Sequence, residues 1–286
     1  MCGIAGVISP NVEDKEAIIG AMVAKIVHRG PDDDGFFVDK YVGLGMRRLS
    51  IIDLASGRQP ITSEDGKLLI FFNGEIYNYQ ELREELLALG FSFKTDSDTE
   101  VILHMFEAEG EKMLTRLRGM FAFSIYNIET KEIFIARDFF GIKPLYYLKQ
   151  DNKIMAFSSE IKSFINFPGF KSEVNDNAVY NYLSFQYNPL TETFWKGVYK
   201  LPPAHFLKIN INTGETEIKK YWSFEFQQNQ SLDENNTTKA IRDVIKDSVE
   251  HHMIADVPVG AFLSGGVDSS IITSLMQEIR GESKIK

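Results

Sequence analysis

The chain has 286 residues, enough for one large domain and part of a second. Hydrophobic residues make up 44% and charged residues 25%, as in a globular protein; because we find neither a long apolar run nor a secretory signal, we expect a cytoplasmic protein with no membrane partner. The net charge of −9 and the lack of a basic patch argue against nucleic acid as a partner, and a single cysteine excludes an intrachain disulfide.

The first part of the chain contains short apolar runs separated by turn residues, together with one helical segment. Apolar residues at helical spacing follow Asn11 or Asp14 and continue to Ile26, and Gly30-Pro31 ends the predicted helix. Strands are expected at residues 3–8, 36–38, 41–46 and 68–72.

Two helices and a second group of strands follow. The helices are expected at residues 81–89, closed by Gly90, and from Asp98 or Thr99 to Glu109. Residues 120–126 and 132–136 predict a hairpin, and further strands are expected at residues 146–148, 154–157 and 206–211. Because the strands do not alternate regularly with helices, we expect mostly antiparallel sheets flanked by helices.

The pattern changes near the C-terminus. Polar residues 227–236 predict a linker, and a helix is expected at residues 238–252. Residues 257–263 predict a buried strand, and residues 271–279 predict a helix. We therefore expect a second unit to begin here.

Cys2 is a candidate nucleophile because it directly follows the initiator methionine. Loss of Met1 would give this residue a free α-amine, whose pKa of about 7.7–8.0 suits it to accept the thiol proton. No histidine lies in a cysteine-protease motif. On position alone, an inert small apolar residue at the start of a strand is the stronger interpretation.

Several segments together resemble the class II glutamine amidotransferases. They are Cys2-Gly3-Ile4-Ala5-Gly6, His28-Arg29-Gly30-Pro31-Asp32, Arg48-Leu49-Ser50-Ile51-Ile52-Asp53, Asn73-Gly74-Glu75-Ile76-Tyr77-Asn78 and Ser97-Asp98-Thr99-Glu100. Residues 119–123 and 137–147 resemble the glutamine-hydrolysing asparagine synthetases more than other members. The resemblance implies an α+β fold: a four-layer α/β/β/α N-terminal-nucleophile glutaminase domain at residues 1–222, with residues 223–286 forming a linker and the truncated start of an α/β adenine-nucleotide hydrolase-like domain.

The resemblance also implies roles for individual residues. Cys2 attacks the glutamine side-chain amide, and the Asn73 side chain and Gly74 N–H receive the oxyanion. Arg48 binds the substrate α-carboxylate, and Asp98 binds its α-ammonium group. Three further residues match positions in the wall of the glutamine site: Leu49, Ile51 and Glu75.

Each of these residues also has an ordinary structural interpretation. Asn73-Gly74 is a common turn pair and could end the preceding strand. Arg48, like its neighbour Arg47, could be a surface arginine, and Asp98 could be a helix N-cap. The family resemblance favours the functional interpretation of each.

A second motif lies between the strand and helix expected at the C-terminus. Its residues are Ser264, Gly265, Gly266, Val267, Asp268, Ser269 and Ser270. Small residues before a helix let N–H groups converge on an anion. The run resembles the pyrophosphate loop of ATP pyrophosphatases, and Asp268 matches a Mg²⁺ ligand in some relatives.

The resemblance implies a two-part reaction in which ammonia from glutamine amidates aspartate through an aspartyl-adenylate made from ATP. Because residues 223–286 are shorter than the family's synthetase domain, we expect a fragment that by itself only hydrolyses glutamine. Two alternatives stay open: amidation of another carboxylate, in cell-wall or secondary metabolism, and a non-catalytic glutamine-binding module. Glutamine, aspartate and ATP are the implied small-molecule partners, and the resemblance also suggests a homodimer.

Overall fold

The computed structural model describes residues 2–226 and 233–281. The chain divides into two compact units, Met1–Ser223 and Phe224–Lys286. The expected removal of Met1 and most of the expected linker, residues 227–232, lie outside the described residues.

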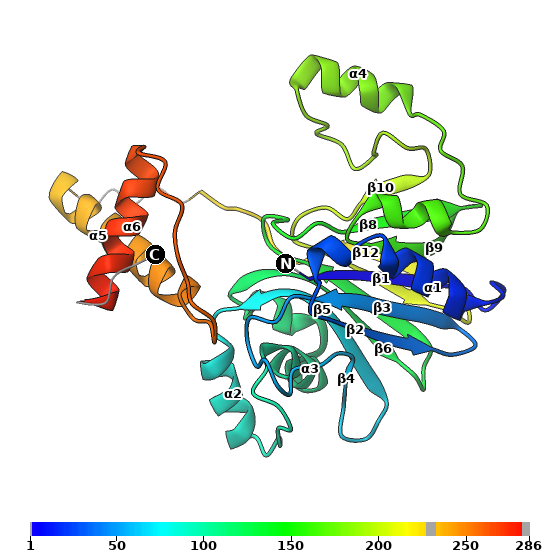
Figure 1. The fold of residues 1–286 in the computed structure, drawn as a ribbon, viewed down its shortest axis with the longest axis horizontal. Coiled ribbons are helices and arrows are strands. Elements are labelled where there is room, and N and C mark those ends of the chain that lie inside the picture. The colour runs from blue at the N-terminus through cyan, green and yellow to red at the C-terminus, as the bar shows by residue number, and fades with distance from the viewer. Residues whose placement is uncertain (1, 227–232, 282–286) are drawn as a thin grey trace. The chain divides into compact units, whose positions relative to one another are not determined.

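Two antiparallel sheets form the centre of the first unit (Figure 1). One has the order β10-β8-β9-β1-β3-β2, with β1 (Gly3–Ile8), β2 (Asp33–Val38), β3 (Val42–Arg48), β8 (Tyr146–Gln150), β9 (Lys153–Ser158) and β10 (Val198–Lys200). The other has the order β12-β11-β7-β6-β5-β4, with β4 (Ile61–Thr62), β5 (Leu68–Ile76), β6 (Gly119–Asn127), β7 (Glu132–Arg137), β11 (His205–Asn210) and β12 (Thr216–Lys220). The expectation of mostly antiparallel sheets is confirmed.

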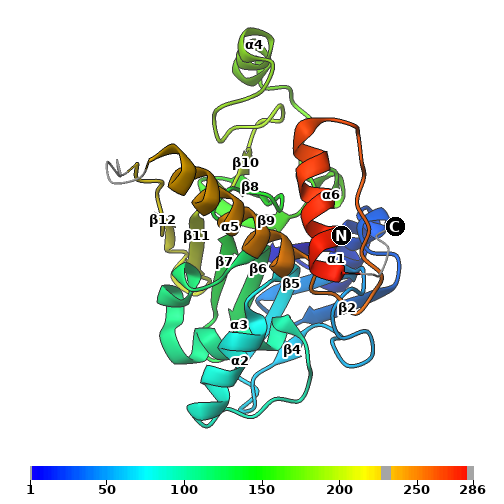
Figure 2. The same ribbon diagram turned by 90° about the vertical axis from the view of Figure 1, so that its left-hand side faces the viewer.

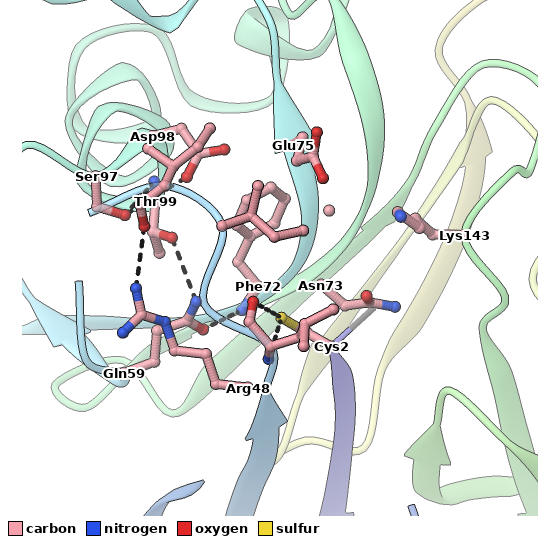
Figure 3. Close-up of a pocket in the computed structure, with 14 residues that line it drawn as sticks. Cys2, Arg48, Gln59, Phe72, Asn73, Glu75, Ser97, Asp98, Thr99 and Lys143 are labelled. Atoms are coloured by element: carbon pink, nitrogen blue, oxygen red, sulfur yellow. Dashed lines mark hydrogen bonds between the residues drawn. The ribbon is translucent and has the colours of Figure 1, made fainter. Parts of the chain in front are cut away.

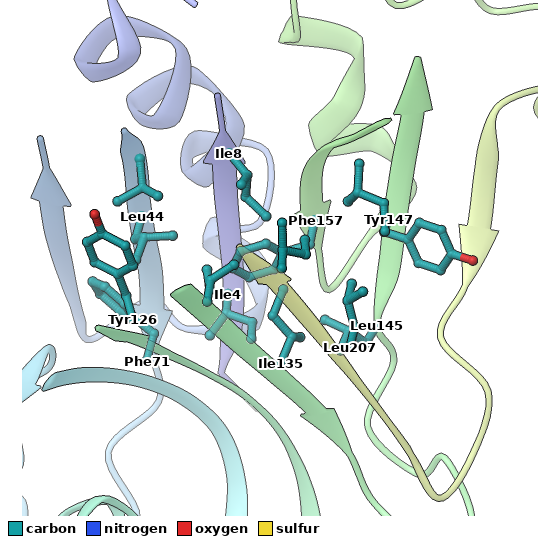
Figure 4. Packing of buried hydrophobic residues seen from close by; sticks show 14 of the residues in the cluster. Ile4, Ile8, Leu44, Phe71, Tyr126, Ile135, Leu145, Tyr147, Phe157 and Leu207 are labelled. Carbon is teal, nitrogen blue, oxygen red and sulfur yellow. The ribbon is translucent and has the colours of Figure 1, made fainter. Parts of the chain in front are cut away.

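Apolar residues from both sheets form the central core (Figure 4). In β1, Ile4 and Ile8 belong to this core, whereas Ala5 and Val7 belong to a second cluster on the opposite face of the same sheet. This alternation follows from the two-residue period of a strand. A strand that is apolar at every position, as β1 is, is therefore covered on both faces.

Helices cover the outer faces of the two sheets. Helix α1 (Lys15–Ala24) packs against the first sheet through Ile19, Met22 and Val23, and Asp14 caps its N-terminus. Helices α2 (Tyr79–Ala88) and α3 (Asp98–Glu109) lie on the side of the second sheet (Figure 2). The layers are thus helix, sheet, sheet and helix, as the resemblance implies.

The remaining elements of the first unit are three 3₁₀ helices and one further α-helix. They are the 3₁₀ helices η1 (Val27–Arg29), η2 (Gly110–Thr115) and η3 (Ile161–Asn166) and the helix α4 (Asp176–Phe185). The sequence pattern did not predict α4 or the strands β4, β10 and β12. Three of these four elements have little apolar periodicity to detect: β4 and β10 are very short, and every residue of β12 is exposed.

The second unit contains two helices, α5 (Glu234–His252) and α6 (Val267–Arg280). They pack through Val249, Leu275 and Met276, and Glu278 of α6 pairs with Arg242 and Lys246 of α5. Asp233 caps α5, so the expected extension of the linker to residue 236 is wrong. Across the described ranges, 2–226 and 233–281, no helix combines the length and apolarity needed to cross a bilayer.

Candidate active site

One pocket in the first unit is lined by every residue that the resemblance assigns to glutamine (Figure 3). These residues are Cys2, Arg48, Leu49, Ile51, Asn73, Gly74, Glu75 and Asp98. Cys2 immediately precedes β1, and Arg48 is the last residue of β3. Because β1 and β3 pair with Gly3 opposite Arg47, the start of one strand lies beside the end of the other. The pocket therefore forms where both sheets end beside helix α3.

The Cys2 thiol is held by the backbone of the loop after β3. The N–H of Leu49 donates to Sγ at 3.3 Å, and the thiol faces the carbonyl oxygen of Leu49 at 3.6 Å. Arg29 Nε donates to the carbonyl oxygen of Cys2 at 2.8 Å and fixes the backbone there. Burial raises the pKa of the Cys2 thiol, and the hydrogen bond from Leu49 and the charge of Arg48 partly offset this rise. An attack by this sulfur thus requires a nearby base.

Asn73 is fully buried, and its side-chain amide has no hydrogen-bond partner among the described residues. Neither Nδ2 nor Oδ1 has a hydrogen bond among the residues that the structure describes. Leaving such a group unpaired costs about 1–3 kcal/mol, so a buried amide of this kind requires an explanation. Here the amide lines the pocket beside Cys2 (Figure 3), where it can donate to an oxygen of a bound molecule.

Gly74 lies inside a strand, so the alternative of a turn at Asn73-Gly74 is wrong. Strand β5 continues to Ile76, with Asn73 opposite Ala122 and Gly74 opposite Phe121 of β6. A Cβ at position 74 would lie 2.2 Å from the carbonyl oxygen of Met120. A glycine is therefore required by close backbone packing rather than by a turn.

Arg48 is buried, so its interpretation as a surface residue is wrong. Its Nη2 donates to the carbonyl oxygens of Ile52 at 3.1 Å and Asp53 at 2.6 Å. These bonds hold the loop after β3 around the guanidinium group. The Arg47 side chain is also largely buried. It donates to the carbonyl oxygen of Gly30 and pairs with Asp34 at 2.6 Å.

Asp98 is the first residue of α3, but it is not the N-cap. Ser97 takes that role by accepting the N–H of Thr99 at 3.1 Å. The Asp98 carboxylate instead accepts the N–H of Ile76 at 3.0 Å, which joins α3 to the end of β5. Burial raises the pKa of Asp98 to about 7, and the nearby charge of Glu75 adds to the rise.

Sequence reasoning missed several residues that line the pocket: Ile52, Gln59, Phe72, Ser97, Thr99 and Lys143. Gln59 accepts the N–H of Phe72 at 2.7 Å and donates to Thr99 Oγ1 at 3.3 Å, which links β5 to α3. Lys143 is only 2% exposed. Its position in the Arg137–Tyr147 motif was a signal, but a lysine in a loop is ordinarily expected at the surface.

The second motif, residues 264–270, differs from its expected context. The predicted buried strand at residues 257–263 is wrong: this segment has no strand, and Phe262 is fully exposed. A strand requires a neighbour, and the described residues of the second unit include none. Helix α6 starts at Val267, so residues 267–270 form its first turn rather than a loop.

The start of α6 nevertheless suits an anion. Gly265 has a positive φ of 83°, and Gly266, which has no side chain to cap the helix, is the N-cap residue. The first N–H groups of a helix have no partners within it, so they remain available to a phosphate. Among residues 2–226 and 233–281, no group of three or more His, Cys, Asp and Glu side chains could bind a metal ion. Asp268 would need phosphate oxygens to complete a Mg²⁺ site.

Comparisons with known proteins identify the family of the chain. The profile described as "Glutamine amidotransferase domain" matches residues 1–222, so the chain belongs to the glutamine amidotransferase family. The profile described as "Asparagine synthase" matches residues 240–286. The family resemblance drawn from the motifs is therefore confirmed.

Individual relatives are similar over nearly the whole chain. The chain is 46% identical to asparagine synthetase (glutamine-hydrolyzing) 1 of Bacillus subtilis, covering 99% of this chain and 45% of that protein. It is 34% identical to a protein of Gibberella zeae named amidase chry2, covering 98% of this chain and 43% of that protein. The chain thus spans less than half the length of these two relatives.

A solved structure supports the fold. The glutamine phosphoribosylpyrophosphate amidotransferase of Bacillus subtilis aligns with a TM-score of 0.56 at 19% identity, covering 98% of this chain and 64% of that one. At this identity the likeness concerns the fold alone. It agrees with the helix, sheet, sheet and helix layers of the first unit.

Proposed function

We propose that the first unit is a glutaminase that uses Cys2 as its nucleophile. The observation that carries this proposal is the buried, unpartnered Asn73 amide beside Cys2 in one pocket with Arg48 and Asp98. A fully desolvated amide donor has the character of an oxyanion stabiliser. Membership in the glutamine amidotransferase family supports glutamine as the substrate.

The proposed reaction uses the α-amine of Cys2 after removal of Met1. The amine takes the thiol proton, and the sulfur attacks the amide carbon of glutamine while its carbonyl becomes an oxyanion. Asn73 Nδ2–H and the Gly74 N–H stabilise that oxyanion. The carbon–nitrogen bond then breaks, ammonia leaves with the proton from the amine, and water hydrolyses the thioester to glutamate and the free thiol.

The other pocket residues bind the parts of glutamine that do not react. Arg48 binds the α-carboxylate, and Asp98 binds the α-ammonium group. Leu49, Ile51 and Glu75 form the wall of the site. Because Asp98 binds a cation as a carboxylate, its pKa of about 7 makes glutamine binding depend on pH near neutrality.

We further propose that the complete protein is a glutamine-dependent asparagine synthetase, in which ammonia amidates aspartate at the expense of ATP. Residues 1–222 form its glutaminase domain, and residues 223–286 hold a linker and the first part of its ATP-binding domain. The match of residues 240–286 to the asparagine synthase family supports this assignment. In the complete protein, the N–H groups at the start of α6 would hold the ATP phosphates, and Asp268 would bind Mg²⁺. The same proposal includes a cytoplasmic location and a homodimer.

An acceptor other than aspartate is the alternative. It is favoured by the similarity to a relative named an amidase rather than an asparagine synthetase. The alternative predicts the same glutaminase chemistry at Cys2.

The experiment that tests the glutaminase proposal is an intact-mass measurement before and after treatment with the glutamine analogue diazo-oxo-norleucine. We expect loss of Met1 and a single adduct that maps to Cys2. Cys2→Ala should form no adduct and lose glutaminase activity, while still binding glutamine. Retention of Met1 without an adduct, or substantial turnover by Cys2→Ala, would contradict the proposal and favour a glutamine-binding module.

A further inference from the structure

Lys143 places an ammonium group at the wall of the pocket. The residue is only 2% exposed, and it lines the pocket together with Cys2, Asn73, Gly74 and Glu75. Within residues 2–226 and 233–281, Nζ makes neither a hydrogen bond nor an ion pair within 4 Å, although the backbone of Lys143 makes both of its bonds. A lysine that is covered along most of its length and has no close partner for its ammonium group is uncommon, so its retention in the same pocket as a nucleophile indicates a functional role.

The loop that carries Lys143 is rigidly attached to the strand beside β5. The buried Asp138 carboxylate accepts the N–H of Lys143 at 2.9 Å and the N–H of Phe121 at 3.2 Å. Arg137 Nε donates to the carbonyl oxygen of Lys143 at 2.8 Å. Since Phe121 lies opposite Gly74 in the sheet, the same anchor positions Lys143 relative to the proposed oxyanion donors. Such tethering is typical of a side chain whose position matters.

Four polar side chains of the pocket lie on two sides of Cys2 (Figure 3). Arg48 and Asp98 lie on one side, whereas Asn73 and Lys143 lie on the other. The guanidinium of Arg48 already donates to two backbone carbonyls. Lys143 therefore adds a cation on the Asn73 side of the sulfur, where the proposed reaction develops negative charge, whereas Arg29 donates to the carbonyl oxygen of Cys2.

The reaction changes the charge at this point. The side-chain amide of glutamine is neutral, whereas the Cys2 thiolate, the tetrahedral oxyanion and the γ-carboxylate of the glutamate product are all anions. A fixed cation interacts more strongly with the anions than with the amide, and interactions that grow in the transition state raise kcat rather than lower KM.

We propose that Lys143 is an electrostatic positioning residue of this site, whose ammonium group stabilises the anionic states formed at Cys2 over the neutral amide of bound glutamine. The inference rests on the proposed glutaminase function and deepens it. It predicts that Lys143 also strengthens binding of the product glutamate relative to glutamine.

The groups facing Lys143 allow it to be charged. Burial lowers the pKa of Lys143, whereas Glu75 of β5, Cys2 and Asp138 favour the ammonium form and Arg29 opposes it. Three of the four charged or ionisable neighbours thus stabilise the cation. The positive charge is the property to be tested, so the variants must remove or keep it.

The first experiment measures the pH dependence of Cys2 alkylation by iodoacetamide in the purified chain. In Lys143→Met we expect the midpoint of the profile to move upward, because the thiolate loses one nearby cation. Lys143→Arg should stay close to the wild type. Lys15→Met is the matched control, because Lys15 is a buried lysine outside the pocket whose Nζ bonds the carbonyl oxygen of Val12.

The second experiment compares steady-state constants of the same variants. We expect Lys143→Met to lose roughly tenfold or more in kcat and to bind glutamate roughly tenfold more weakly, with little change in the KM for glutamine. A purely structural role would instead raise KM and lower the melting temperature without moving the alkylation profile.

The outcomes separate this inference from the proposed function. An unchanged alkylation midpoint in a folded Lys143→Met variant overturns the role of Lys143, whether or not the wild type hydrolyses glutamine. If the wild type does not hydrolyse glutamine, the glutaminase proposal is contradicted. A midpoint that still moves upward in Lys143→Met would then support the electrostatic coupling between Lys143 and Cys2. If Lys143→Met fails to fold, Lys143→Gln provides the same test with a polar side chain, and the same unchanged midpoint overturns the inference.

Discussion

The pocket around Cys2 and the start of α6 offer similar chemical groups in opposite surroundings. In the pocket, Asn73 and Asp98 are buried, and backbone bonds from three strands and a helix hold the site. At the start of α6, the side chains of Ser264, Ser269 and Ser270 bond one another or the carbonyl oxygen of Gly266, and residues 264–268 are exposed.

This difference concerns preorganisation. In the pocket, burial shifts the pKa values of Cys2 and Asp98 and leaves the Asn73 amide without a partner. Such a site has its donors in place before a substrate arrives. At the start of α6, exposed groups are solvated and their interactions with an anion are weakened by water. The pocket around Cys2 should therefore respond to single substitutions far more strongly than the C-terminal segment.

Among substitutions that keep Cys2, the largest effect is expected at Asn73. Asn73→Leu removes the proposed oxyanion donor, so we predict a loss of about 10²–10³ in kcat with little change in KM. Because the amide has no partner in the free protein, replacing it with an apolar side chain of similar size should leave the melting temperature unchanged or raise it. Steady-state kinetics and thermal unfolding measure both. A variant that keeps full kcat would show that the buried amide is not an oxyanion donor.

Substitution of Arg48 should act mainly on binding. Arg48→Ala removes charged hydrogen bonds to the α-carboxylate, and we predict that KM for glutamine rises roughly 10–100-fold. The control is Arg58→Ala, since Arg58 lies in the following loop with its side chain 79% exposed. If both variants have the same KM as the wild type, Arg48 does not bind the substrate.

The pH dependence of Asp98 gives a smaller effect with a defined sign. Folded Asp98, with a pKa of about 7, holds a proton that the unfolded chain releases above its pKa of about 3.9. Its contribution to the free energy of unfolding is therefore fully present below pH ~4 and is lost as the pH rises to about 7. Asp98→Asn should not show this loss of unfolding free energy between pH ~4 and about 7, and it should be more stable than the wild type at pH 8.

Glutamine binding should show the opposite trend, because the proposed role of Asp98 requires the carboxylate. In a Cys2→Ala background, affinity for glutamine should increase as the pH rises through about 7, and Asp98→Asn should bind weakly at every pH. Calorimetric titrations at several pH values measure this. If the Cys2→Ala protein with Asp98 intact binds glutamine with an affinity that is independent of pH, Asp98 does not bind the α-ammonium group.

The smallest effect is expected in the C-terminal segment. Phe262→Ala should leave the melting temperature unchanged, because Phe262 is fully exposed. Phe71→Ala, in the core between the sheets, should by contrast cost about 3–5 kcal/mol. Thermal unfolding distinguishes the two; a marked loss of stability in Phe262→Ala would mean that residues 257–263 are packed, as their apolar pattern predicts.

The apolar patterns predicted much of the fold because they record burial directly. The run at residues 3–8 became the doubly covered strand β1, and the hairpin of β6 and β7 formed as its turn residues indicate. The same logic failed at residues 257–263, where apolar residues have no strand to pair with among the described residues. Helix α4 was missed although Asn175 caps it, since its apolar residues are mostly exposed.

The candidate site was predicted from local motifs, which carry residue type and spacing. Cys2, Arg48, Asn73 and Asp98 lie far apart in the chain, and residue type alone left a turn, a surface arginine and a helix cap as alternatives. Only the tertiary structure excluded these, because burial, strand register and hydrogen bonds to distant residues depend on how segments pack.

By itself, the sequence determined the family, the positions of the proposed nucleophile and substrate-binding residues, and the layered antiparallel architecture, because these follow from short motifs and periodicity. The tertiary structure alone decided that Asn73 is unpartnered, that the pKa of Asp98 is raised by burial and that Lys143 points its charge into the pocket. These are properties of desolvation, and desolvation depends on segments that are distant in sequence and meet only in the folded chain.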